Sequence, residues 1–208
     1  RVKTQNGSIK AERVILACNG YLENLEKRLS SKILPMNNYI VATKPLDDDM
    51  VNKINPRDIA FADSRFVINY FRLSADKRLL FGGGENYSKN LSKNIAPIVT
   101  KPLEKIYPFL KGVKIDYAWG GKLAITMNRL PFFTTLHNDK VISAQGYSGQ
   151  GVALASYSGK IVSEKITGDG ETFDIMSSIP RQSFPGGRFL RNPSMKIGML
   201  YYSLLDRI

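Results

Sequence analysis

The 208-residue sequence has very little of several side chains on which enzymes depend. It contains one cysteine (Cys18), one histidine (His137) and one tryptophan (Trp119). A single cysteine excludes an internal disulfide framework and a cysteine-based metal cluster. No group of His, Cys and carboxylate residues has metal-ligand spacing, and no G-x-x-x-x-G-K-[ST] motif is present for a nucleoside triphosphate. His137 stands in the polar run TLHNDK, where we expect a surface turn, which argues against a Ser-His-Asp triad.

The sequence also has no apolar run long enough to span a bilayer, and its first residues lack the apolar segment of a signal peptide. A lone cysteine fits a reducing compartment, so the expected location is cytoplasmic. Acidic residues are few: 30 Lys and Arg against 18 Asp and Glu give a formal net charge of +12. The basic residues are dispersed among acidic ones and form no basic stripe, which favours a solvated surface over nucleic-acid binding.

The apolar and turn residues that are present predict two styles of fold in one chain. The runs 14–17 and 141–144 indicate short buried strands of a parallel sheet, and a hairpin turning at Asn6-Gly7 precedes the first. Between them, strands at 38–46, 66–72, 78–82 and 113–119, a charged loop after Leu46 and a proline-containing helix at 95–107 indicate an antiparallel sheet. We therefore expect the antiparallel part to be inserted into the other, and the chain to begin within a domain.

The most informative segment joins the strand at 141–144 to a helix. Gly146, Gly149 and Gly151 cluster at the turn, and apolar residues from Val152 to Ile166 continue with helical spacing. Glycines allow a ligand to approach the backbone, and the first N–H groups of a helix favour an anion or an electron-rich ring edge. The spacing G-x-x-G-x-G is not the G-x-G-x-x-G of a pyrophosphate site, and a tight turn without a ligand is the alternative interpretation.

Tyr70 and Arg72 stand two residues apart on a predicted strand, so both side chains lie on one face of the sheet. A guanidinium beside a tyrosine hydroxyl suits a substrate carboxylate. The alternative is a solvated strand face with an ordinary Arg–Asp ion pair.

Five segments in order make the chain similar to a known family. They are VILACNGYL at 14–22, VATKPL at 41–46, YFRLSADKRLLFGG at 70–83, AWGGKLAITMNRLPFF at 118–133 and GYSGQGVALASYSGKIVSEKI at 146–166. Together they resemble the D-amino-acid-oxidase-like (DAO) FAD-dependent oxidoreductases, in particular the gamma-glutamylputrescine oxidoreductase type. The ending FPGGRFLRNPSMKIGMLYYSLLDRI is similar to that subgroup as well.

The resemblance implies an α+β fold with an antiparallel or mixed substrate-domain sheet and helices, plus the C-terminal remnant of a Rossmann-like FAD domain. It assigns 1–37 to part of the FAD-binding domain and 38–120 to the substrate-binding sheet. Residues 121–168 then return to the FAD-binding domain, and 169–208 form a helical tail. The family's N-terminal G-x-G-x-x-G unit for the ADP half of FAD has no counterpart here. The chain is thus similar to the C-terminal half of such an enzyme, and we expect it alone to bind FAD poorly and to be inactive.

In the complete enzyme the resemblance implies non-covalent FAD. Gly149, Gln150, Gly151 and Val152 would present backbone N–H groups to the flavin ring, and Trp119, Gly120 and Gly121 would run beside it. For Trp119 the alternative is a core aromatic beside a bulge. Residues 19–21 would end a strand near the adenosine half of FAD, or form a plain strand-to-helix turn.

The implied reaction is hydride transfer from the carbon next to a neutral amine, with hydrolysis of the resulting imine. The partner is a small-molecule amine or amino acid, with Tyr70 and Arg72 as substrate-binding residues, and not nucleic acid. The tail from Phe189 to Ile208 predicts an amphipathic helix on the protein's own core; an exposed apolar stripe there would instead favour an oligomer contact or a peripheral membrane site. The alternative function is a flavin-free ligand-binding or scaffolding domain derived from such an enzyme.

Overall fold

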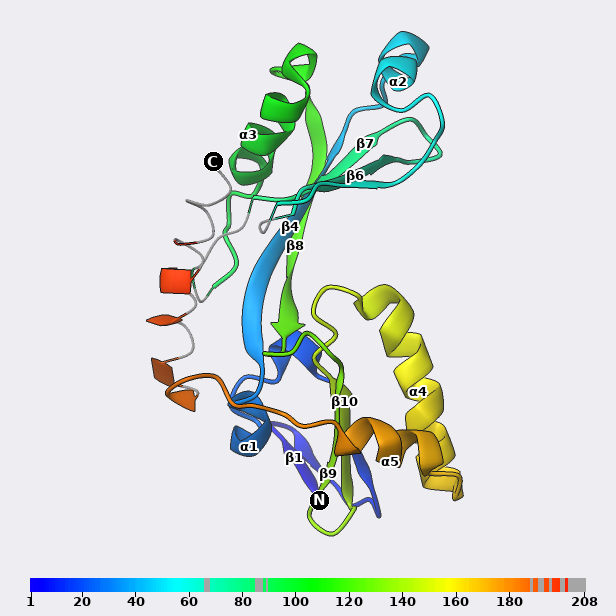
Figure 1. Ribbon diagram of the computed structural model, residues 1–208, viewed down its shortest axis with the longest axis vertical. Helices are drawn as coiled ribbons and strands as arrows, with labels where there is room; N and C mark the ends of the chain where they lie inside the picture. The colour runs from blue at the N-terminus through cyan, green and yellow to red at the C-terminus, as the bar shows by residue number, and fades with distance from the viewer. Residues whose placement is uncertain are drawn as a thin grey trace. The chain divides into compact units, whose positions relative to one another are not determined.

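The computed structural model describes residues 1–65, 68–84, 88, 90–187, 189, 190, 193, 194, 196–198 and 201. The chain divides into two compact units. The first comprises Arg1–Pro35 and Leu123–Arg191, and the second comprises Met36–Lys122 and Asn192–Ile208. The boundary falls within two long strands, β4 (Leu34–Thr43) and β8 (Ile115–Ile125) (Figure 1).

The first unit is built on a mixed sheet in the order β3-β10-β9. β3 (Val14–Leu16) runs parallel to β10 (Val141–Gln145), and β9 (Phe132–Leu136) is antiparallel to β10. α4 (Gly151–Thr167) contacts β10, and α5 (Glu171–Ser178) contacts β9 and α4 (Figure 1). The core that these helices share with the sheet is formed by Phe133, Ile142, Ala144, Ile161, Val162 and Phe173.

A second cluster of the first unit joins Leu22, Leu29, Ile33, Ala124 and Phe132 and includes residues flanking η1 (Asn19–Tyr21) and in α1 (Lys27–Ser30). Ahead of β3, the hairpin of β1 (Val2–Thr4) and β2 (Gly7–Ile9) pairs Thr4 with Gly7. The turn is therefore Gln5-Asn6, one residue earlier than expected, because Gly7 already pairs in β2. The expectation that β3 is buried is wrong for Ile15, which is 50% exposed. Among the described residues, no strand pairs with the outer edge of β3.

The second unit contains a sheet in the order β5-β6-β7-β4-β8. β5 (Phe61–Ala62), β6 (Tyr70–Leu73), β7 (Leu79–Gly82) and β4 pair antiparallel in that order. Its core contains Tyr39, Val41, Leu79 and Phe81 from the strands and Val99 and Leu103 from α3 (Ala96–Ile106), with Leu110 from η2 (Pro108–Leu110). The rings of Phe71 and Phe81 stack at 5.4 Å between centroids across β6 and β7.

Two local features differ in how well the sequence predicts them. α3 forms with Pro102 inside it, as expected. The expected charged loop after Leu46 is instead α2 (Asp48–Ile54), because the Asp47 side chain accepts a hydrogen bond from Met50 N at 2.8 Å and caps the helix.

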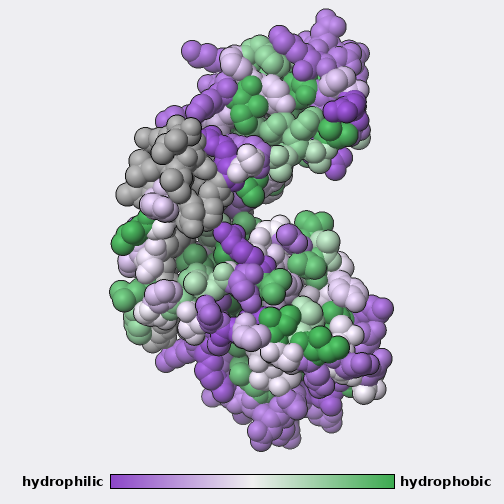
Figure 2. Space-filling model, viewed as in Figure 1, coloured by the Kyte–Doolittle hydropathy of each residue, from purple (hydrophilic) through white to green (hydrophobic). Residues whose placement is uncertain are grey.

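No helix in the described part of the chain is long and apolar enough to cross a membrane. The helical tail expected at 189–208 falls largely outside the described residues. Figure 2 shows hydrophilic residues spread over the visible face and interleaved with apolar ones, as the dispersed charges of the sequence predict.

Candidate functional site

The glycine-rich turn leads from β10 into α4. Gly146, Ser148 and Gly149 have φ angles of 78°, 52° and 98°, all in the left-handed region. A Cβ at Gly146 would lie 2.6 Å from Thr126 Cγ2, so both the conformation and the space require glycine there. At Gly149 the conformation alone favours glycine, since the space beyond it is open.

The N-terminus of α4 is exposed and carries no side-chain cap. Gln150 stands at the N-cap position without a capping hydrogen bond, and Val152 is 97% exposed. The first N–H groups of a helix have no intrahelical acceptor, and the helix dipole adds a partial positive charge at this end. This end of α4 therefore suits an anion or an electron-rich group.

Two amide side chains lie at the strand ends beside the turn. Asn19, the first residue of η1, follows β3, and its Oδ1 accepts a hydrogen bond from Gly146 N at 3.1 Å, which ties the two segments together. Gln145, the last residue of β10, is fully buried, and neither Oε1 nor Nε2 has a hydrogen-bond partner among the described residues. A buried amide without a partner costs free energy, so the Gln145 amide would gain from a hydrogen bond to a ligand or a water molecule.

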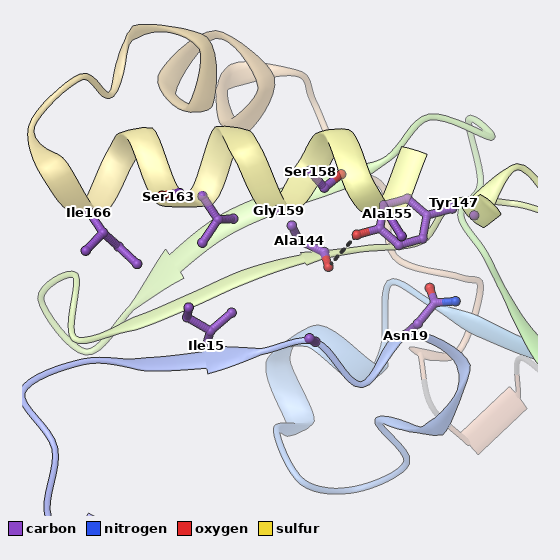
Figure 3. A pocket seen from close by; sticks show the side chains of 12 residues that line it. Ile15, Asn19, Ala144, Tyr147, Ala155, Ser158, Gly159, Ser163 and Ile166 are labelled. Carbon is purple, nitrogen blue, oxygen red and sulfur yellow. Dashed lines mark hydrogen bonds between the residues drawn. The ribbon is translucent and has the colours of Figure 1, made fainter. Parts of the chain in front are cut away.

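A groove of about 510 Å³ runs between α4 and the two parallel strands (Figure 3). Ile15 and Ala144 line it from the strands, and Ala155, Gly159 and Ile166 line it from α4. Tyr147 Oη donates to Ala144 O at 3.0 Å beside Asn19 (Figure 3). Small side chains along α4 leave the groove open, and its lining is mainly apolar.

In the second unit, Tyr70 and Arg72 share the face of β6 opposite to its core, because Phe71 packs against the core and Leu73 is part of it. Tyr70 Oη donates to Asn38 Oδ1 at 2.5 Å. Arg72 is exposed, and its Nε donates to Leu73 O at 3.2 Å. Among the described residues Arg72 forms no ion pair, so the expected alternative of an Arg–Asp pair is not found there.

Trp119 lies on the same face as Tyr70. A Cβ on the neighbouring Gly120 would lie 2.5 Å from Cδ1 of the core residue Tyr39, so Gly120 faces the core. Trp119 and Gly121 therefore face the other way, and Trp119 is 45% exposed. The close approach of β8 to β4 therefore explains by itself why a glycine is needed at position 120.

The charged groups of the second unit centre on Arg78. It forms ion pairs with Asp76 and Asp116, each at 2.7 Å. Hydrogen bonds from Arg78 lower the pKa of Asp116, and hydrogen bonds from Ser74 and then Arg78 lower the pKa of Asp76. Burial raises the pKa of Tyr107 and lowers that of Arg181. In the described part of the chain no three His, Cys, Asp or Glu residues are placed to hold a metal ion.

The structure thus groups the predicted site residues by unit. Gly149, Gln150, Gly151 and Val152 gather at the start of α4, while Tyr70, Arg72, Trp119 and Gly121 share one sheet face. Sequence reasoning missed Gln145, Asn38 and Gly82. The available signals were an amide at the end of an apolar strand, an Asn within another strand, and the glycine run at 82–84.

Comparison with known proteins gives two sets of similarities. A family model described as DAO, FAD dependent oxidoreductase, matches residues 1–165. Gamma-glutamylputrescine oxidoreductase of Escherichia coli (strain K12) is 38% identical over 208 residues, covering 100% of this chain and 49% of that protein. Probable oxidoreductase OrdL of Rhizobium meliloti (strain 1021) is 39% identical over 206 residues, covering 99% and 47%. The chain spans about half the length of the curated relatives it matches.

Among solved structures, glycine oxidase from Geobacillus kaustophilus has a TM-score of 0.65 at 19% identity, covering 86% of this chain and 48% of that one. L-proline dehydrogenase from P. horikoshii has a TM-score of 0.59 at 20% identity, covering 93% and 50%. At these identities the likeness concerns the fold. Together with the antiparallel and mixed sheets, it confirms the expected α+β class.

Proposed function

The chain belongs to the FAD-dependent oxidoreductase family, and from this premise we propose that it supplies the flavin-ring end and the substrate face of an enzyme that oxidises a C–N bond. The substrate is a small amine or amino acid. The observation that carries the proposal is the uncapped, exposed start of α4, which follows a glycine turn and the unpaired amide of Gln145.

The residues present fit the ring end of FAD. When bound, FAD supplies a hydride acceptor for the carbon next to the amine nitrogen. Gly149, Gly151 and Val152 offer backbone N–H groups to stabilise negative charge on an electron-rich edge, without a titrating side chain. The N–H of Gln150 donates to Tyr147 O at 2.9 Å, so Gln150 holds the turn in place. In the second unit, Trp119 and Gly121 are the residues that we assign to flavin contact. The FAD is held without a covalent bond.

On the substrate side, Arg72 and Tyr70 carry the assigned roles. Arg72 has guanidinium donors available to a carboxylate, and Tyr70 is fixed through Asn38. The amine reacts as the neutral base, and water then hydrolyses the imine product. Neither step needs a histidine, which agrees with the exposed position of His137.

We propose that the groove beside α4 binds the part of the relatives' length that this chain does not cover. A strand and a helix would cover its apolar lining and the outer edge of β3, with which no strand pairs among the described residues. We assign that role to the other half of the family's length, which would also hold the remainder of FAD. The chain alone is then inactive.

The test uses the purified chain, FAD and a second polypeptide, the part of the E. coli gamma-glutamylputrescine oxidoreductase outside the match. The chain alone is expected to lose flavin absorbance on gel filtration, whereas the mixture retains it in a complex. Under anaerobic conditions gamma-glutamylputrescine should bleach the flavin of that complex. If the chain alone retains flavin, the proposal that it needs a second polypeptide to hold FAD is wrong. If no amine bleaches the flavin of the complex, the proposal of amine oxidation is wrong.

In the same complex, Arg72→Ala is expected to raise KM about tenfold, as loss of a charge-assisted hydrogen bond implies, with little change in kcat. Lys53→Ala is a control in the same unit, since the Lys53 Nζ lies 4.1 Å from the centroid of the exposed Phe109 ring. An unchanged KM would remove Arg72 from the substrate site.

A further inference from the structure

Four adjacent strands of the second unit carry a row of residues on the face turned away from the core. The row runs from Tyr70 on β6, over Gly82 on β7, to Asn38 on β4 and Trp119 on β8. Tyr70 is paired with Gly82 in the sheet register. A Cβ at Gly120, next to Trp119, would lie 2.9 Å from Asn38 O, which places β8 at the level of Asn38.

The Tyr70 ring lies across β7. Its hydroxyl reaches Asn38 Oδ1 at 2.5 Å on the strand beyond, a span of two strand spacings of about 4.8 Å each. A Cβ at Gly82 would overlap this ring and lie 2.5 Å from Tyr70 Oη. Gly82 does not have a positive φ, so what glycine provides here is space above the backbone and not a special conformation.

The Asn38 side chain can also donate a hydrogen bond to a ligand. Its Oδ1 accepts from Tyr70, while Nδ2 has no hydrogen-bond partner among the described residues. Across the sheet, the row therefore presents in order the ring of Tyr70, the amide donor of Asn38 and the 45% exposed indole of Trp119. Methylene groups pack well on aromatic rings, and a carbonyl oxygen is the natural acceptor for an amide N–H.

We propose that Asn38 and Gly82 are positioning and specificity-determining residues for an acylated aliphatic amine. Gly82 lets Tyr70 lie flat, Asn38 fixes the phenol, and Asn38 Nδ2 donates to the acyl carbonyl of the ligand while its methylene chain lies on the rings. The inference rests on the proposed function for the amine class of the substrate. The row itself involves no flavin.

The test follows Trp119 emission, because this is the only tryptophan in the sequence. The probes are N-acetylputrescine and hexylamine, which carry the same single positive charge and have similar length, but only the first has an amide. Both should change the emission of the flavin-free chain saturably. N-acetylputrescine should bind about fivefold more tightly, as one net hydrogen bond implies.

Three variants separate the roles. Asn38→Asp keeps an acceptor for the Tyr70 hydroxyl but loses the N–H donor, so it should bind both probes equally. Gly82→Ala displaces the ring and should weaken both probes, yet have no further effect in a Tyr70→Ala background. Lys114→Ala is a control at an exposed position just before β8, and it should not change the binding of either probe.

No saturable response to either probe, or equal binding of both by the unmodified chain, would overturn the proposal. So would weakening by Gly82→Ala that persists without Tyr70. If Gly82→Ala fails to fold, as circular dichroism would reveal, Asn38→Asp decides alone. Flavin retention is measured separately, so a failure here leaves the proposed oxidoreductase function testable on its own.

Discussion

At the scale of single residues, Gln145 is the least expected feature of the fold. It is fully buried on β10, opposite Phe132 in the sheet register, and its amide has no partner in the described part of the chain. We expect Gln145→Met, which nearly conserves volume and removes the unpaired amide, to raise the free energy of unfolding by about 1–2 kcal/mol. Urea denaturation monitored by circular dichroism gives this value.

The control for that substitution is Gln145→Ala, which also removes the amide but leaves a cavity, and should destabilise the chain by about 1–3 kcal/mol. If Gln145→Met is itself destabilising, the amide must be paired with a bound water or ligand in solution. Flavin retention in the two-part complex then separates the two: it should fall in Gln145→Met if the amide contacts the ligand, and stay unchanged if the amide binds a structural water.

Gly146 carries a second residue-scale prediction. Its φ of 78° and the 2.6 Å approach of a Cβ to Thr126 Cγ2 both oppose a side chain. Gly146→Ala should therefore lower the free energy of unfolding by about 2–3 kcal/mol, whereas Gly149→Ala, with φ of 98° and open space, should cost only about 1 kcal/mol. Equal losses would mean that the contact with Thr126 contributes nothing.

At the scale of elements, Arg78 connects three strands of the second unit. Its guanidinium donates to Thr43 O of β4 at 2.8 Å and to Asp116 of β8 at 2.7 Å, and it precedes β7 directly. Arg78 also pairs with Asp76, and the pKa values of Asp76 and Asp116 both lie below their usual range. The contacts with Thr43 O and Asp116 therefore tie the start of β7 to β4 and β8.

The sign of the resulting pH dependence follows from those depressed pKa values. A carboxyl group with a lower pKa in the folded state stabilises the fold above its unfolded pKa of about 3.9, and this stabilisation is lost as the pH falls through the folded pKa. The Tm of Asp116→Asn should be below that of the parent near neutrality, and the two should converge below about pH 4.

Thermal melts over a pH series measure that convergence. Asp48→Asn is a matched control, because Asp48 pairs with Lys77 at 2.7 Å but both side chains are mostly exposed, and such pairs contribute little. A Tm difference for Asp116→Asn that stays constant down to acid pH would contradict an electrostatic origin.

The elements also show how far sequence patterns reach. Strands with strong apolar periodicity, such as β10, and the helix after it were predictable, because burial on one face imposes that pattern. α2 was not, because its stability depends on Asp47 capping a run that otherwise reads as a charged loop. The pairing of Tyr70 with Asn38 was equally hidden, since it depends on strand order and on the space above Gly82.

At the scale of the whole molecule, the net charge of +12 and the groove beside α4 are the two surface properties that bear on partners. The charge is dispersed, so it should produce only weak binding to polyanions that salt removes. The groove is specific, because its lining is apolar and small, and because β3 offers an unpaired strand edge next to it among the described residues.

Gly159 is the position at which to test the groove. It is exposed on α4, and a Cβ there would meet nothing, so Gly159→Trp should leave the Tm of the isolated chain unchanged or slightly higher. In the two-part mixture the indole fills the groove, and the complex should weaken by at least about tenfold in gel filtration or sedimentation. Lys160→Trp adds the same side chain one residue further along α4, at an exposed position outside the groove lining, and should not interfere. Equal effects of the two tryptophans would show that the second polypeptide binds elsewhere, and the assignment of the groove would then fail.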